Sequence, residues 1–142
     1  MLSDDLESLL PKNIFDDSGL NILSSLSESE IAPIVPKLIR WMADINWPVA
    51  FKVRDVLAKF PYISVNIVRD VLKENENDNI LKFWTIRKLI PFYPYECQLS
   101  LLDDLKRICY APTEGEKSEE VDIYAAELIS KIVSGVDKRA AD

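Results

Sequence analysis

Apolar residues recur at helical spacing along most of the chain, from residue 28 to residue 133. The clearest case is the segment 47–60, where Val49, Val53 and Leu57 follow one another every four residues and share one helix face. No segment alternates persistently between β-branched and polar residues, so the pattern gives little support to strands. The pattern predicts an all-α protein.

Prolines and polar runs divide this pattern into six main helices. Pro61 ends one helix and opens the next, and the polar run "KENENDN" separates two others. We expect the helices to form three antiparallel hairpins, which pair 33–43 with 47–60, 61–73 with 79–90, and 95–110 with 117–134. Positions in the second helices repeat at intervals of 37 residues, from Trp47 to Trp84 and from Trp84 to Val121. Such a period is typical of a HEAT-like α-solenoid.

The length of 142 residues predicts a single domain, 1–142, with one hydrophobic core. Within it we expect an irregular N-terminal arm over 1–26, helical hairpins over 27–134 and a frayed tail over 135–142. The stretch "APTEGEKSEE" is expected to be a loop, and its acidic residues suit the positive end of the last helix. A role in the first turn of that helix explains this cluster of acidic residues better than a metal site does.

The charge balance narrows the classes of partner. The chain carries 17 Lys and Arg against 24 Asp and Glu, a net charge of −7. Nucleic-acid binding needs a positive surface, so no nucleic-acid partner is expected. No apolar run approaches the ~20 residues of a membrane helix, and the acidic start "MLSDDLESLL" lacks the features of a secretory signal. We therefore expect a cytoplasmic protein without membrane contact.

Residue types that support catalysis are scarce. The chain has no histidine, which removes the commonest general base and zinc ligand, and only three glycines, which form no phosphate-binding loop. We expect no enzyme activity, no metal and no cofactor. An enzyme that uses carboxylate acid–base chemistry remains as an alternative, although no spacing of residues supports it.

The corner "WMADINWPVA", residues 41–50, offers the best candidate site. Asp44 and Asn46 can cap the helix that follows, and Trp41 can pack against Trp47 at the top of the hairpin. If the second hairpin stacks on the first, these residues would share a rim rich in aromatic, amide and charged groups, a composition typical of binding hot spots. The candidate partner-binding residues on this rim are Trp41, Asp44, Asn46, Trp47, Lys82, Trp84 and Arg87. The other interpretation is that the corner has only a structural role.

Three short blocks, "LLPKNIFDD", "WMADINWPVA" and "PTEGEK", together with Lys82 and Trp84 as a K-x-W motif, resemble a small bacterial family of uncharacterised domains. Its signature runs L-P-K-N, then W-x-x-D-x-N-W-P-V-A, then K-x-W, then P-T-x-x-E. The resemblance implies a small helical, HEAT-like domain. It brings no activity, substrate or catalytic residue.

From these observations we expect a small protein–protein interaction module that binds a basic partner, because an acidic surface steers basic proteins toward it. An immunity-type protein or an adaptor is one concrete version. A purely structural or self-associating domain is the competing hypothesis, and the sequence leaves the oligomeric state open.

Overall fold

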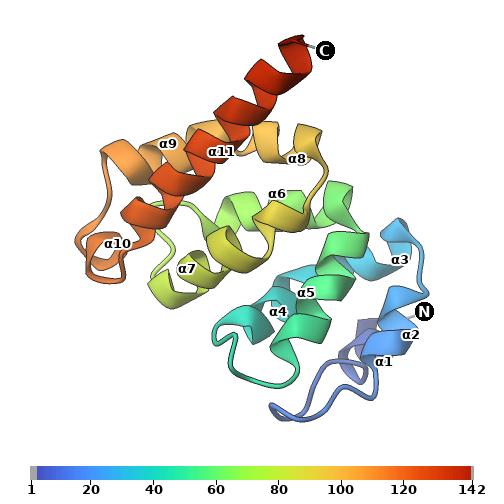
Figure 1. Cartoon of the computed structure of the whole chain (residues 1–142). Coiled ribbons are helices and arrows are strands. Elements are labelled where there is room, and N and C mark those ends of the chain that lie inside the picture. The colour runs from blue at the N-terminus through green and yellow to red at the C-terminus, as the bar shows by residue number, and fades with distance from the viewer. Residues whose placement is uncertain (1–2, 142) are drawn as a thin grey trace. The chain divides into compact units, whose positions relative to one another are not determined.

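The computed structural model describes the backbone of residues 3–141 and the side chains of residues 5–135 (Figure 1). About 70% of the chain is helical, and the described residues contain no strand, so the predicted all-α class is confirmed. The chain divides into two compact units, residues 1–67 and 68–142, with the boundary inside one helix, α6 (Pro61–Val71). The single-domain prediction and the solenoid arrangement stay predictions.

The first unit is built from short helices around an aliphatic core. Leu23, Val35, Leu38 and Val53 are fully buried there. The elements that precede α6 are α1 (Ser3–Glu7), α2 (Leu20–Ser24), α3 (Glu28–Ile31), η1 (Ala32–Ile34), α4 (Val35–Leu38), η2 (Ile39–Met42) and α5 (Ala50–Lys59).

The predicted helix 33–43 is broken into three pieces, η1, α4 and η2, of which the first and last are 3₁₀-helices. Pro33 and Pro36 lie at the start of the first two pieces, where each removes a backbone donor and prevents a continuous α-helix. The helix predicted to start at residue 47 begins three residues later in the structure, where α5 starts at Ala50.

The irregular segment 8–19 packs closely on the rest of this unit. The Val49 amide donates a hydrogen bond to the Ile14 carbonyl at 3.1 Å, which ties the segment to the corner before α5. A Cβ at Gly19 would lie 2.1 Å from the Leu9 carbonyl oxygen, so only glycine allows the chain to approach itself here. These contacts hold the middle of the predicted irregular arm, which also contains the short helices α1 and α2.

The second unit packs its long last helix across the others. After the C-terminal part of α6 come α7 (Asn79–Lys88), η3 (Ile90–Phe92), α8 (Tyr95–Ser100), α9 (Leu102–Tyr110), α10 (Glu114–Ser118) and α11 (Val121–Ala141). Helix α11 lies against α9 and α7 (Figure 1). Its buried face presents Val121, Ala125, Leu128 and Ile132, as the helical spacing predicts.

Three boundaries in this unit differ from the prediction. The segment 95–110 is divided between α8 and α9 by a turn at Leu101. The stretch expected to be a loop contains α10, and a break at Glu120, with a φ of 60°, separates it from α11. The expected frayed tail continues the helix to Ala141.

None of the helices in the described range is long and apolar enough to cross a membrane.

Candidate functional site

A cleft of about 230 Å³ opens between α7 and α11 in the second unit. Arg87 lines this cleft, and its guanidinium lies 4.4 Å above the ring of Tyr124. The same guanidinium is 5.1 Å from the Phe83 ring and 5.7 Å from the Trp84 ring. Three aromatic rings thus surround one cation, an arrangement that orients it by cation–π attraction.

Helix geometry and edge contacts build this aromatic shelf, defined as Phe83, Trp84 and Tyr124. Arg87 lies three and four residues after Trp84 and Phe83 on α7, so its side chain reaches both rings on one face. Phe83 packs edge-to-face with Trp84 at 4.9 Å and with Tyr124 of α11 at 5.0 Å. The shelf therefore joins the two helices that border the cleft.

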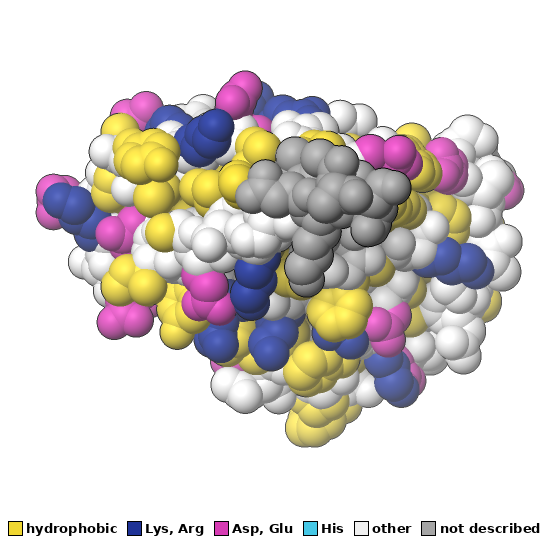
Figure 2. Space-filling view, turned by 45° about the horizontal axis from the view of Figure 1, so that its top comes forward, with side chains coloured by type: hydrophobic (Ala, Val, Ile, Leu, Met, Phe, Trp, Pro, Cys, Tyr) yellow, Lys and Arg dark blue, Asp and Glu magenta, His cyan; other side chains and the backbone are white. Residues whose placement is uncertain are grey.

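Cations outnumber anions around the cleft. Lys88 and Lys131 line it together with Arg87, against the single carboxylate of Glu127. Lys131 and Glu127 form an ion pair at 3.2 Å, and both side chains are exposed. On the face drawn in Figure 2, basic, acidic and hydrophobic side chains are interspersed.

Arg87 differs from the two other half-buried arginines described in this unit, of which Arg69 has an ion pair with Asp104 at 3.6 Å. Arg107 forms a bidentate ion pair, whereas Arg87 has neither an ion pair nor a hydrogen bond with any residue that the structure describes. Among the described residues, the interactions of its guanidinium are those with the aromatic shelf. Its N–H donors thus remain available to a molecule that enters the cleft.

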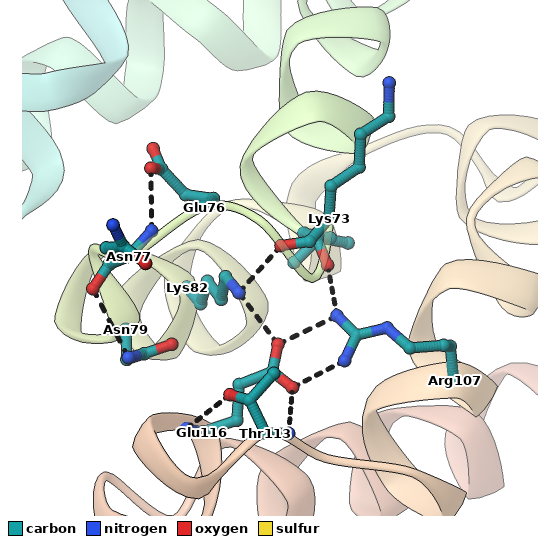
Figure 3. A network of polar contacts seen from close by, with 9 residues as sticks. Lys73, Glu76, Asn77, Asn79, Lys82, Arg107, Thr113 and Glu116 are labelled. Atoms are coloured by element: carbon teal, nitrogen blue, oxygen red, sulfur yellow. Dashed lines mark hydrogen bonds and ion pairs between the residues drawn. The ribbon is translucent and has the colours of Figure 1, made fainter.

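A network of polar contacts lies in the interior of the same unit and is shown in Figure 3. Glu116 of α10 accepts hydrogen bonds from Arg107 of α9 at 2.6 and 2.8 Å and from the Lys82 ammonium of α7 at 2.8 Å. The side chains of Glu116 and Lys82 are fully buried. We call Lys82, Arg107 and Glu116 the buried triad.

The two cations of the buried triad also complete the end of α6. Lys82 donates to the Lys73 carbonyl at 2.9 Å, and Arg107 donates to the Leu72 carbonyl at 2.7 Å (Figure 3). Carbonyls just beyond a helix C-terminus lack helical partners and are favoured by positive charge. The triad therefore connects α6, α7, α9 and α10.

A capping box holds Glu116 in place. The Glu116 amide donates to the Thr113 hydroxyl at 3.1 Å, and the Thr113 amide donates to the Glu116 carboxylate at 2.9 Å. The sequence T-x-x-E was a local signal for this helix start, but the sequence analysis treated the segment as a loop. A Cβ at Gly115 would meet the side-chain amide nitrogen of Asn79 at 2.2 Å, so Asn79 would have to move to admit a larger residue.

The buried triad shifts the ionisation of its members. Burial acts to raise the pKa of Glu116, but hydrogen bonds from Arg107, Lys82 and the Thr113 amide outweigh it and lower the pKa from 4.5 to about 2. The hydrogen bond to Glu116 raises the pKa of Arg107 above its ordinary value. Both shifts favour the charged pair in the folded state.

The predicted corner of the first unit is held together by internal contacts. Trp41 packs edge-to-face against Trp47 with ring centroids 5.9 Å apart, as expected. The Asp44 carboxylate accepts from the Asn46 amide at 2.9 Å, and the Asp44 carbonyl accepts from the Trp47 amide. Asn46 does not cap α5, because that helix begins four residues later and has no side-chain cap.

The predicted rim residues lie in both units. Trp41, Asp44, Asn46 and Trp47 belong to the first unit, and each is at least partly exposed. In the second unit Arg87 lines the α7–α11 cleft and Trp84 belongs to the aromatic shelf, and their role in binding stays a prediction. Lys82 is the exception, because its fully buried side chain offers no surface to a partner. A rim common to both units stays a prediction.

A larger groove of about 400 Å³ lies between α2 and α5 in the first unit. Its two lysines already have partners, since Lys52 pairs with Asp17 and Lys59 donates to the Ser24 carbonyl. Among the residues described, no group of three His, Cys, Asp or Glu side chains is arranged to hold a metal ion. The α7–α11 cleft is therefore the stronger candidate site.

Replacing Glu116 by Ala should lower the free energy of unfolding by ~3–5 kcal/mol, because it leaves the Lys82 ammonium buried without its counter-ion. The matched control is Glu127→Ala, which removes an exposed ion pair and should cost no more than ~0.5 kcal/mol. Urea unfolding followed by circular dichroism measures both. Equal losses in the two variants would contradict the importance assigned to the buried triad.

The stability contributed by Glu116 should depend on pH. Its pKa is lower in the folded state, so its contribution is complete above its ordinary pKa of 4.5 and disappears as the pH falls toward about 2. Between those two pH values the free energy of unfolding of the wild type should fall by about 3 kcal/mol more than that of Glu116→Gln does. The other carboxylates titrate in both proteins, so the difference between their urea midpoints, followed as a function of pH, reports on Glu116 alone. Parallel curves would show that the pKa of Glu116 is not depressed.

Comparison with known proteins places the chain in a family. No functionally curated protein matches it. A family described as "Domain of unknown function (DUF5071)" matches residues 9–129, a range that includes the corner, the buried triad and the residues of the α7–α11 cleft other than Lys131. The chain belongs to the DUF5071 family.

Proposed function

We propose that the protein is a small cytoplasmic protein-interaction module of the HEAT-like helical-repeat type, and that it contacts its partner through the α7–α11 cleft. The observation that carries the proposal is Arg87, a half-buried cation that rests on three aromatic rings and has no ion pair among the described residues. A protein partner would supply the missing polar contact.

The composition of the cleft supports binding. Arginine, tryptophan and tyrosine are the residues most enriched in interface hot spots, and all three meet at this point. The shelf holds Arg87 before a partner arrives, which reduces the entropy lost on association.

The same residues give less support to catalysis. General acid–base catalysis favours a carboxyl group whose pKa is moved toward neutrality by burial. Glu127, the carboxylate of the cleft, is exposed and paired with Lys131. A binding role therefore accounts for the site better than the carboxylate-enzyme alternative does.

The proposal includes the predicted three-hairpin solenoid, whose repeated faces are suited to extended partners. The net charge of −7 would steer a partner with a basic surface toward the protein, and an immunity-type protein or an adaptor is one version of such a module. The corner at Trp41 and Trp47 offers a second contact. The competing proposal is self-association. It is favoured by exposed aromatic residues outside the cleft, such as Phe15 and Tyr110.

Affinity capture from the native cell followed by titration with the purified partner tests the proposal. We expect wild type to bind one protein at fixed stoichiometry, and Arg87→Gln to bind it at least about tenfold more weakly at an unchanged urea midpoint. Lys106→Gln removes an exposed lysine of α9 and serves as the matched control, with affinity within about twofold of wild type.

Two outcomes would overturn the proposal. Equal binding by Arg87→Gln would remove the cleft as the contact. A wild-type protein that captures no partner but sediments as a dimer at micromolar concentration would favour self-association instead. Asp44→Ala, tested in parallel, shows whether the corner contributes to the same interaction.

A further inference from the structure

We propose that the group bound in the α7–α11 cleft is a side-chain carboxylate of an acidic peptide segment. This inference rests on the proposed function and adds the chemistry of the group recognised. It differs from the sequence-based expectation, because net charge alone favours a basic partner, whereas the cleft itself is lined by three cations and one carboxylate.

The geometry of Arg87 favours a planar anion. The guanidinium carbon lies 4.4 Å from the Tyr124 ring centroid, a distance typical of a cation held over a ring face. A guanidinium used in this way keeps N–H donors that match the two oxygens of a carboxylate. Because Arg87 has no such partner within the described part of the chain, binding does not require an existing ion pair to break.

The neighbouring charges reinforce this preference. Lys88 and Lys131 border the same cleft, and the exposed pair between Lys131 and Glu127 is of a kind that contributes little stability. An incoming carboxylate can therefore compete with Glu127 for Lys131. At physiological salt the Debye length is about 8 Å, so acidic residues that lie farther than this from the cleft are largely screened from a ligand in it.

The apolar part of the lining distinguishes a glutamate side chain from an inorganic anion. Ile86 and Leu128 are buried residues that contribute to the wall of the cleft. They can contact the methylene groups of a glutamate side chain, whereas a phosphate ion has no apolar atoms to place there. A cleft of about 230 Å³ has room for such a side chain but not for a folded domain.

Titration of the ¹⁵N-labelled full chain tests the inference without knowledge of the natural partner. The probes are a blocked hexaglutamate peptide, the matching hexaglutamine peptide and inorganic phosphate. The reporter is the indole N–H signal of Trp84, since its ring belongs to the shelf beneath Arg87. Hexaglutamate should shift this signal in a saturable and salt-sensitive manner, and hexaglutamine should not.

Variants then assign the effect to Arg87. Arg87→Gln should weaken hexaglutamate binding at least about tenfold, and Arg87→Lys should weaken it to a smaller extent because the charge remains but the planar fork is lost. Lys106→Gln should bind as wild type does. Urea midpoints of all variants establish that they remain folded.

Each opposing result has a definite meaning. The absence of a saturable shift with hexaglutamate, an equal shift with hexaglutamine, or undiminished binding by Arg87→Gln would overturn the carboxylate proposal. Tighter binding of phosphate than of hexaglutamate would identify a phosphate site instead. The protein-interaction proposal fails separately, when Arg87→Gln captures the natural partner as well as wild type does.

Discussion

The ion pair between Glu116 and its two cations is the constraint on which the second unit depends. Glu116 is fully buried and accepts four hydrogen bonds, from Lys82, Arg107 and the Thr113 amide. Burying these charges carries a large desolvation penalty, which is offset only when the geometry satisfies every member. Apolar packing tolerates small shifts, whereas this network restricts four elements to one arrangement.

The buried triad and the candidate cleft are coupled through α7 and α10. Lys82 lies inside, and the next two residues of α7, Phe83 and Trp84, contribute the aromatic shelf. On the other side, α10 leads through the left-handed backbone of Glu120 into α11, which brings Tyr124 beneath Arg87. The position of α10 therefore determines where α11 begins, and with it the geometry around Arg87.

The buried cations and Arg87 differ in the groups that surround their charges. Lys82 and Arg107 have protein acceptors that replace the water they lose on burial. Arg87 is half-buried, and within the described structure its guanidinium interacts with aromatic rings but with no hydrogen-bond acceptor. A charge left in this condition is stabilised further when a partner supplies an anion.

Local sequence patterns predicted the elements that depend on helix periodicity. Val49, Val53 and Leu57 are buried on one face of α5, and the all-α class follows from the same spacing. Trp84 and Arg87 were placed on a binding rim on the assumption that the second hairpin stacks on the first, and their binding role stays a prediction.

Features that depend on distant residues were not predicted. Lys82 was assigned to a partner-binding rim, because the carboxylate that allows its burial lies 34 residues further along the chain. Tyr124 was missed because it reaches the shelf from α11, whose packing on α7 leaves no local signal. The break at Glu120 has a positive φ without the glycine that usually marks one.

The central claim is that the buried triad sets the geometry of the cleft. The ring-current shift of the Arg87 Nε–H signal measures that geometry directly, because the guanidinium lies over the Tyr124 ring. In Glu116→Gln that still folds, this signal should move toward the value of an unstructured arginine, while Glu114→Gln, an exposed change in the same helix, should leave it unchanged. A folded Glu116→Gln protein with the wild-type Arg87 shift would contradict the account.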